Sequence, residues 1–258
     1  MKTKNITKGI ILAGGSGSRL HPVTKVISKQ LLPIYNMPMI YYPLSNLIKS
    51  GIKDILIITT PRDLDLFQRL LSFENDWEVK IDFTVQEKPE GIAQAFIIAE
   101  KWLNGSQSIL ILGDNLFFGP DLEKIIHNAC DENTGATIFG YKSESPERFG
   151  VIEFNEKNEV ISIEEKPSNP KSRWVATGLY IFNSKVLNKA KNLKKSKRGE
   201  FEITDLNNMY LTENNLKVVL LDEKFSWLDT GTHESLLEAS IIVRDIQRKF
   251  GKDIIGLK

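Results

Sequence analysis

A glycine-rich segment with hydroxyl and basic side chains directly follows an apolar stretch near the start of the chain. The apolar residues are 9–13, and the segment reads Gly14-Gly15-Ser16-Gly17-Ser18-Arg19. Glycines let successive backbone N–H groups point at one anion, and the serines add hydroxyl donors. Leu20 breaks the dinucleotide-binding pattern, and Ser18 breaks the P-loop pattern. We therefore predict a phosphate-binding loop of another kind, with a plain turn after the first strand as the alternative.

Basic residues continue just beyond this loop, at Arg19, Lys25 and Lys29. Lysine and arginine pair strongly with phosphate oxygens, and arginine does so through a fixed fork of donors. A solvated basic face is the usual explanation for such charges. Their position directly after a glycine loop favours phosphate binding instead.

Two aspartates stand where a metal ion could be held. Asp114 follows the apolar residues 109–112, and Asp229 follows residues 225–228. In open α/β sheets, ligands collect beyond the carboxyl ends of strands. Two carboxylates together with substrate phosphates commonly hold Mg²⁺. Each aspartate taken singly is more often a helix cap or a turn residue, but the pair beside a glycine loop favours a metal site.

The other candidate groups carry weaker signals. His21, His127 and His233 stand alone in the sequence, and Cys130 reads as a small core residue. Glu165 and Lys166 close another predicted strand, where they could bind sugar hydroxyls and a phosphate or form a surface ion pair. The basic residues between 185 and 198 lie near Glu200 and Glu202 with few aromatics, which favours a solvated helix face over nucleic-acid binding.

Strands and helices alternate through the first half of the chain. Short runs rich in isoleucine and leucine predict strands over 8–13, 54–59, 79–85 and 108–112, and helices are predicted over 38–50, 62–72, 91–103 and 120–128. This alternation indicates βαβ units and a mostly parallel sheet.

The pattern changes at Gly135. Closely spaced strands are predicted over 136–141, 150–154, 160–163 and 175–182, followed by helices over 202–214 and 232–250, with Thr232 as the N-cap of the last helix. A mixed β region inserted into the first layer fits this better than further βα winding. We therefore predict an α/β fold in a single domain spanning residues 1–258.

Composition excludes several classes of protein. The chain has 258 residues, of which 41% are hydrophobic and 26% charged, as in soluble globular proteins rather than disordered or fibrous ones. Lysine plus arginine number 34 against 33 acidic residues, so no global field attracts nucleic acid or an anionic membrane. No apolar run approaches the roughly 18 residues of a membrane span. The single cysteine, Cys130, favours a reducing cytoplasm.

Several motifs, in order, resemble the sugar-phosphate nucleotidylyltransferases. They are Leu12-Ala-Gly-Gly-Ser-Gly-Ser-Arg-Leu-His-Pro22, Ser28-Lys-Gln-Leu-Leu-Pro33, Pro38-Met-Ile-Tyr-Tyr-Pro43, Gln86 through Gln94-Ala-Phe96, Leu112-Gly-Asp-Asn115, Pro146-Glu-Arg-Phe-Gly-Val151, Glu164-Glu-Lys-Pro167, Thr177-Gly-Leu-Tyr180, Arg198-Gly-Glu-Phe-Glu-Ile-Thr-Asp205 and Trp227-Leu-Asp-Thr-Gly-Thr232. The second and the last of these are similar to the glucose-1-phosphate thymidylyltransferase branch. The resemblance covers essentially the whole chain.

This resemblance implies a fold and a reaction. The fold would be the Rossmann-like, three-layer, mostly parallel nucleotide-diphospho-sugar transferase fold with an inserted mixed β region. The reaction would be dTTP plus α-D-glucose 1-phosphate giving dTDP-glucose and pyrophosphate with Mg²⁺, as in dTDP-rhamnose and polysaccharide biosynthesis. The partners would be these two substrates and further copies of the chain, in a dimer or tetramer, with no nucleic acid and no membrane.

The resemblance also implies residue roles. Arg19, Lys29, Lys166, Asp114 and Asp229 would be catalytic, and the two aspartates would hold the metal. Nucleotide-binding residues would be Leu12, Gly14, Gly15, Ser16, Gly17, Ser18, Arg19, Gln30, Gln86, Pro89 and Gly91. Sugar-phosphate-binding residues would be Asn115, Gly150, Glu165, Lys166, Ala176 and Arg198. Residues 1–134 and 200–258 would form the nucleotide and metal core, and residues 135–199 mainly the sugar-phosphate part.

The sequence departs from the family pattern at a few positions, and other functions are possible alternatives. Ser18 and Phe149 stand where threonine and tyrosine are common, and both changes are mild. Many relatives continue beyond the position of Lys258 with helices that contribute to an effector site, so we expect dTDP-rhamnose to inhibit weakly or only by competition. Rivals are a UTP- or CTP-using enzyme and a catalytically silent sugar-nucleotide sensor. A nicotinamide-dependent oxidoreductase is disfavoured by the failed dinucleotide pattern.

Overall fold

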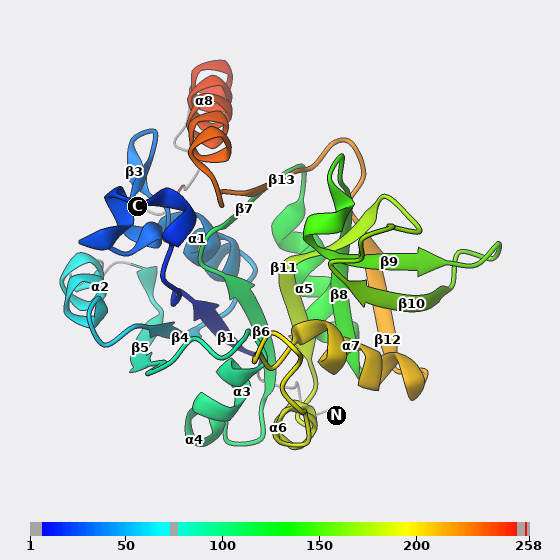
Figure 1. Ribbon diagram of the computed structural model, residues 1–258. Helices are drawn as coiled ribbons and strands as arrows, with labels where there is room; N and C mark the ends of the chain where they lie inside the picture. Colours follow the sequence, from blue (N-terminus) through cyan, green and yellow to red (C-terminus); the bar gives the residue numbers. More distant parts are fainter. Residues whose placement is uncertain (1–6, 73–76, 252–255, 257–258) are drawn as a thin grey trace. The chain divides into compact units, whose positions relative to one another are not determined.

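The computed structural model describes all residues except 1–6, 73–76, 252–255 and 257–258 (Figure 1). The chain forms two compact units that interleave along the sequence. One, the glycine-loop unit, consists of Gly9–Pro89, Ile111–Lys124 and Ser226–Lys258. The other, the β11 unit, consists of Met1–Lys8, Glu90–Leu110 and Ile125–Phe225. Strands β1 (Thr7–Leu12) and β6 (Gln107–Leu112) contribute residues to both units.

Parallel strands form the core of the glycine-loop unit. Strand β1 pairs in parallel with β4 (Asp54–Thr59), which pairs in parallel with β5 (Lys80–Val85). Strands β1 and β4 contain runs of isoleucine and leucine, and Ile10, Ile57 and Ile58 are fully buried, as strands covered on both faces require, whereas β5 is only partly buried. Helices α1 (Tyr41–Lys49) and α2 (Leu64–Leu71) connect the strands.

Short elements complete this unit. Strands β2 (Pro33–Ile34) and β3 (Met37–Pro38) form a small hairpin that contacts α8 (His233–Phe250), the orange-red helix in Figure 1. Strand β7 (Asn115–Phe118) pairs antiparallel with β13 (Ser226–Asp229) in a separate two-stranded sheet.

The β11 unit is mixed. Strand β11 (Trp174–Phe182) pairs antiparallel with β8 (Ala136–Lys142) and β9 (Gly150–Phe154), and β9 pairs antiparallel with β10 (Val160–Glu165). Strand β12 (Leu216–Leu220) runs parallel to β8. The helices are α3 (Gln94–Ile98), α4 (Glu100–Leu103), α5 (Leu122–Glu132, which begins in the other unit), α6 (Val186–Lys191) and α7 (Ile203–Thr212). An aromatic cluster of Phe96, Phe182 and Tyr210 fills its core.

The predicted α/β class, with mostly parallel strands and an inserted mixed β region, is confirmed. Most predicted elements are present with ends shifted by a few residues. The helix predicted over 91–103 is divided into α3 and α4 at Ala99, and it begins only at Gln94. Strands β7 and β12 and helix α6 were not predicted, because each is short and lacks a clear period in the sequence. No helix among the described residues is long and apolar enough to cross a membrane.

The start of α8 is capped as predicted. The Thr232 hydroxyl accepts a hydrogen bond from the Ser235 backbone N–H at 3.2 Å, and the Ser235 hydroxyl accepts one from the Thr232 N–H at 3.0 Å. This reciprocal capping box satisfies two helix-terminal donors that would otherwise lack helical partners.

Replacing Thr232→Ala should lower the free energy of unfolding by about 1 kcal/mol, because the cap acceptor is lost. Urea denaturation followed by circular dichroism measures this change. A variant as stable as the wild type would show that the capping box adds nothing to the stability of α8.

Candidate functional site

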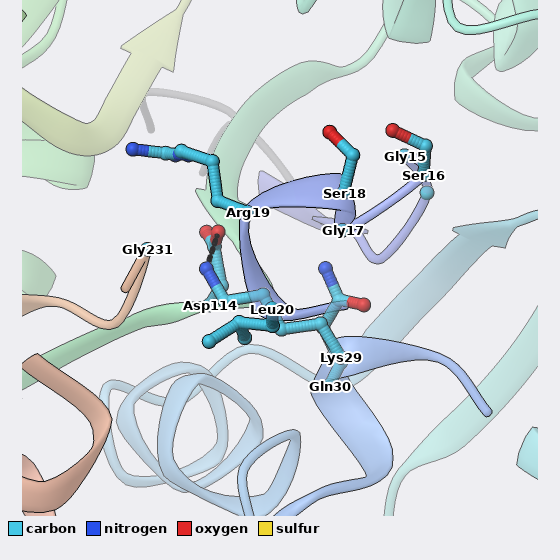
Figure 2. Close-up of a pocket in the computed structure, with 11 residues that line it drawn as sticks. Gly15, Ser16, Gly17, Ser18, Arg19, Leu20, Lys29, Gln30, Asp114 and Gly231 are labelled. Carbon is cyan, nitrogen blue, oxygen red and sulfur yellow. Dashed lines mark hydrogen bonds and ion pairs between the residues drawn. The ribbon is translucent and has the colours of Figure 1, made fainter. Parts of the chain in front are cut away.

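A pocket of about 210 Å³ lies at the end of β1 (Figure 2). The glycine loop forms one side of it, and the complete lining is Gly14, Gly15, Ser16, Gly17, Ser18, Arg19, Leu20, Lys29, Gln30, Asp114 and Gly231. Gly15 and Gly17 have φ angles of 105° and 57°, in the left-handed region that favours glycine. The Thr24 hydroxyl donates to the Gly17 carbonyl at 2.7 Å and holds the turn. The loop thus has the left-handed turns that a backbone anion cradle needs.

The Arg19 guanidinium lies directly against Gly231. A Cβ atom at position 231 would be 2.7 Å from Nη2 and 2.8 Å from Nη1 of Arg19. Gly231 therefore leaves the space that Arg19 occupies beside the pocket (Figure 2).

Asp114 lines the same pocket, and its side chain is paired with a lysine and an asparagine. Lys29 Nζ donates to Asp114 Oδ2 at 2.6 Å, and Asn115 Nδ2 donates to Oδ1 at 3.0 Å. The Lys29 side chain is 8% exposed and that of Asp114 is 23% exposed. Burial acts to raise the pKa of Asp114, but the charge of Lys29 and these hydrogen bonds outweigh it and hold the pKa below its usual value. Asp114 is therefore an ionised oxygen donor that faces a pocket.

The β7–β13 pair brings the main chain of Asp229 close to that of Asp114. Asp229 is the register partner of Asn115, the residue after Asp114. The hydroxyl of Thr230 donates to the Asp114 carbonyl at 2.9 Å and ties the two strand ends together. A small antiparallel sheet thus brings the main chains of the two aspartates together, whereas the sequence predicts this from two strands that end at the same edge of a parallel sheet.

A second pocket, of about 260 Å³, adjoins the first through Gly15 and Ser16. It is lined by Gly15, Ser16, Thr60, Arg62, Gln86, Glu87 and Pro89. Gln86 is 4% exposed, and a Cβ atom at Gly14 would lie 2.9 Å from its Oε1. The bare backbone of Gly14 is therefore what lets the Gln86 amide lie against the loop. The first pocket is lined by Arg19 and Lys29, and the second by Gln86 and Pro89. Two adjoining pockets of this kind suit a ligand with a charged end and a planar end.

The β11 unit gathers a different set of predicted residues. Glu165 is the register partner of Gly150, and its carboxylate accepts a hydrogen bond from the Thr204 hydroxyl. Glu165 Oε1 lies 3.5 Å from Arg198 Nη2 and 3.6 Å from Lys166 Nζ. Lys166 has a φ of 46°, a left-handed conformation that is uncommon outside glycine and is found at functional sites. A carboxylate and two cations of the predicted sugar-phosphate set therefore cluster at the end of β10.

Arg198 is held mainly by Glu202. Its Nη2 donates to Glu202 Oε2 at 2.8 Å and its Nε donates to Oε1 at 3.1 Å, and Glu200 accepts a further bond. These bonds to Glu202 raise the pKa of Arg198. The Arg198 side chain is still 40% exposed, so it can contact a ligand while these bonds hold it in place.

Gly91 lies against the main chain of Phe201. Its φ is 105°, and a Cβ atom there would be 2.5 Å from the Phe201 carbonyl oxygen. The Phe201 N–H donates to the Glu90 carbonyl at 2.7 Å, and the Ala93 N–H donates to the Phe201 carbonyl at 3.2 Å. This close approach explains why α3 begins after Gly91 and gives the glycine a structural role.

Comparison with known proteins decides the family. The sequence matches the family model described as nucleotidyl transferase over residues 8–245. Curated proteins named glucose-1-phosphate thymidylyltransferase include one from Neisseria meningitidis at 53% identity, which matches 93% of this chain and 83% of that protein. Another, from Xanthomonas campestris, is 50% identical over 96% of this chain and 84% of its own length. The chain belongs to the glucose-1-phosphate thymidylyltransferases.

Solved structures agree with this membership. A crystal structure of a Bacillus anthracis protein assigned to the same activity, in complex with a sucrose, is 41% identical with a TM-score of 0.86, covering 93% of this chain and 96% of that one. A UDP-glucose pyrophosphorylase structure with UDP-glucose has a TM-score of 0.79 at 21% identity, over 93% of this chain and 99% of that one, and shows the fold alone. The predicted family resemblance and enzyme class are confirmed.

The residues predicted for this thymidylyltransferase divide between the two units. The glycine-loop unit contains Leu12, the loop, Lys29, Gln30, Gln86, Pro89, Asp114, Asn115 and Asp229, whereas the β11 unit contains Gly91, Gly150, Glu165, Lys166, Ala176 and Arg198. Residues 90–110 and 200–225 thus group with the predicted sugar-phosphate part, so the compact units follow other boundaries than the predicted division by ligand. That functional division, like the individual residue roles, stays a prediction.

Sequence reasoning gave no role to several residues that hold the predicted ones. Thr204 and Glu202 bond to Glu165 and Arg198, and Thr60 and Arg62 line the second pocket. Glu202 and Thr204 lie within the motif at 198–205 but have no role assigned from it, and Thr60 and Arg62 have no spacing signal, so only their three-dimensional neighbours reveal what these residues contact. Among the described residues, no group of three or more histidine, cysteine, aspartate or glutamate side chains could hold a metal, which leaves the aspartate pair as the candidate.

Replacing Gly91→Ala should lower the free energy of unfolding by more than about 1 kcal/mol, because the new methyl group meets the Phe201 main chain in a left-handed backbone. Gly105→Ala is the matched control, since Gly105 also has a positive φ, of 74°, but no atom within 4 Å of the added Cβ. Thermal unfolding of both variants measures the difference. Equal losses of stability in the two variants would show that the Phe201 main chain moves aside for the methyl group at little cost.

Proposed function

We propose that this chain transfers the thymidylyl group of dTTP to α-D-glucose 1-phosphate, forming dTDP-glucose and pyrophosphate with Mg²⁺. The observation that carries the proposal is the first pocket, where a glycine loop, Arg19, Lys29 and Asp114 face one cavity. The names of the relatives support the choice of dTTP and glucose 1-phosphate.

Both pockets of the glycine-loop unit suit the nucleotide. Backbone N–H groups of the loop and the charges of Arg19 and Lys29 would bind the β- and γ-phosphates in the first pocket. The thymine would lie in the adjoining second pocket, where Gln86 provides a polar group beside the base edge and Pro89 an apolar surface.

The attacking substrate would be bound by groups of the β11 unit. Arg198 and Lys166 would hold its phosphate, and Glu165, with Gly150 beside it, would accept hydrogen bonds from glucose hydroxyls. A phosphate oxygen of the sugar then attacks the α-phosphorus in line, a new P–O bond forms, and the bond to the β-phosphate oxygen breaks. Positioning and charge neutralisation supply the catalysis.

Asp114 and Asp229 fit a magnesium ion. Both are hard oxygen donors, Asp229 is the register partner of the residue after Asp114, and Asp114 is ionised and lines the first pocket. Bound there, Mg²⁺ would neutralise charge on the phosphates as the leaving group departs.

We further propose that the chain acts as a homo-oligomer in a reducing cytoplasm, as expected for this family. Cys130 is buried, and burial raises the pKa of its thiol to about 12, so it stays a protonated core residue. Light scattering coupled to size-exclusion chromatography tests the oligomeric state.

The function is tested by measuring pyrophosphate release for dTTP, UTP, CTP, ATP and GTP against several sugar 1-phosphates. We expect the highest kcat/KM for dTTP with glucose 1-phosphate. UTP should also react, because discrimination by one methyl group amounts to roughly 10–200-fold. A clear preference for CTP or ATP contradicts the proposal, and no turnover with any pair favours a sugar-nucleotide sensor.

Replacing Asp114→Asn or Asp229→Asn should each lower turnover by about two orders of magnitude with the fold retained, equivalent to roughly 2.7 kcal/mol of barrier. The amide keeps the shape but removes an anionic oxygen ligand. Turnover as a function of Mg²⁺ concentration, with circular dichroism on the same samples, measures the effect. Near-normal turnover in either variant at ordinary Mg²⁺ removes that residue from the metal site.

Replacing Gly231→Ala should raise the KM for dTTP about tenfold, because the new methyl group displaces the Arg19 guanidinium. This displacement weakens the proposed hydrogen bond from Arg19 to the dTTP phosphates, which is worth about 1.5 kcal/mol or more. The control is the same change in an Arg19→Ala background, where it should have no further effect. Independent, additive losses would show that Gly231 acts on something other than Arg19.

A further inference from the structure

The indole of Trp227 is a buried hydrogen-bond donor beside the predicted metal ligands. Trp227 lies on β13, two residues before Asp229, and is 8% exposed. Its Nε1–H donates to Asn115 Oδ1 at 2.7 Å, and both groups are buried. The distance is short for an N–H···O bond, and the bond is shielded from competing water.

The same Asn115 amide also bonds to Asp114. Its side chain is 2% exposed, and its Nδ2 donates to Asp114 Oδ1 at 3.0 Å. The amide therefore bridges an indole donor on one side and a carboxylate acceptor on the other.

From this bridge we infer that Trp227 is a positioning residue for Asp114, acting through Asn115 to fix the direction in which the carboxylate presents its oxygens to a divalent cation. The inference rests on the proposed role of Asp114 in binding Mg²⁺. In this role Trp227 needs its indole N–H as a hydrogen-bond donor, and not only its ring for packing.

The donor chemistry makes the bridge directional. The indole N–H is a donor only, and an ionised carboxylate is an acceptor only. If the Asn115 amide turned over, its NH₂ would face the indole N–H, and its oxygen would face the Asp114 carboxylate. Both contacts would then be repulsive, so Trp227 selects the one orientation that supports Asp114.

Such outer groups matter because a metal ligand binds best when its orientation is already fixed. Removal of an outer hydrogen-bond partner typically costs 10–100-fold in metal affinity. Lys29 bonds to the other oxygen of Asp114 through an ammonium whose three donors are equivalent by rotation, whereas Asn115 bonds through a buried planar amide with one fixed direction. The Trp227–Asn115 pair therefore gives the support of Asp114 that depends on direction.

The test replaces Trp227→Phe, which keeps an aromatic ring and removes the N–H. We expect the affinity for Mn²⁺ alone, titrated by electron paramagnetic resonance, to fall about tenfold. The Mg²⁺ concentration for half-maximal turnover should rise by a similar factor, and kcat at saturating Mg²⁺ should largely recover. Asp114→Asn in the same titration shows that the measured site is the one at Asp114.

Trp77→Phe is the matched control. Trp77 belongs to the same unit and is 7% exposed, and its ring packs edge-on against Tyr41 with centroids 5.6 Å apart. This variant should lose comparable packing but keep its Mn²⁺ affinity. Equal Mn²⁺ affinities in the two tryptophan variants would overturn the inference.

A double-mutant cycle tests the route through Asn115. In an Asn115→Ala background, Trp227→Phe should add little further loss of Mn²⁺ affinity, whereas full additivity would contradict the bridge. If Asp114→Asn leaves Mn²⁺ binding unchanged, the inference falls together with the metal assignment. If Mn²⁺ binding responds as expected but no nucleotide pair reacts, the proposed function fails and the positioning role stands.

Discussion

The buried carboxylate of Asp114 is the constraint on which the arrangement of the glycine-loop unit depends. An ionised carboxylate that leaves water must be compensated by charges and hydrogen bonds, or it neutralises. Lys29 supplies the charge, Asn115 supplies an amide donor, and Thr230 fixes the main chain of the same residue. Because Thr230 comes from the far end of the chain, satisfying Asp114 also requires that β13 lie beside β7.

The motif at 227–232 is explained residue by residue through this constraint. Trp227 donates to the Asn115 amide, Asp229 lies opposite Asn115 in the register, and Thr230 bonds to the Asp114 carbonyl. Gly231 then leaves room for Arg19, and the following threonine caps α8. A short run of sequence thus joins the proposed metal ligands, the glycine loop and the last helix.

Local features could be predicted from the sequence, whereas features set by distant partners could not. The strand running into the loop at Gly14 and the cap at Thr232 depend on neighbours a few residues away, so their residue types suffice. Strand β7 has four residues and no period of its own, and it exists because β13 pairs with it. Gly91 is predicted from the resemblance as a ligand contact, and this stays a prediction, but the Phe201 main chain that lies against it could not be predicted. The motif resemblance named candidate residues but could not show which groups hold them.

In each unit, a basic side chain predicted to bind phosphate is paired with a carboxylate. Lys29 is bonded to Asp114 in one unit, and Arg198 is bonded to Glu202 in the other. An unpaired cation at such a partly buried place would disfavour folding before any ligand arrived, so pairing lets the chain fold with its binding groups already in position. In the proposed reaction, substrate phosphates would meet Lys29 and Arg198 while Asp114 and Glu202 still hold these side chains in place, as the partial exposure of Arg198 allows. The geometry of the two carboxylates would then fix where the proposed phosphate sites lie.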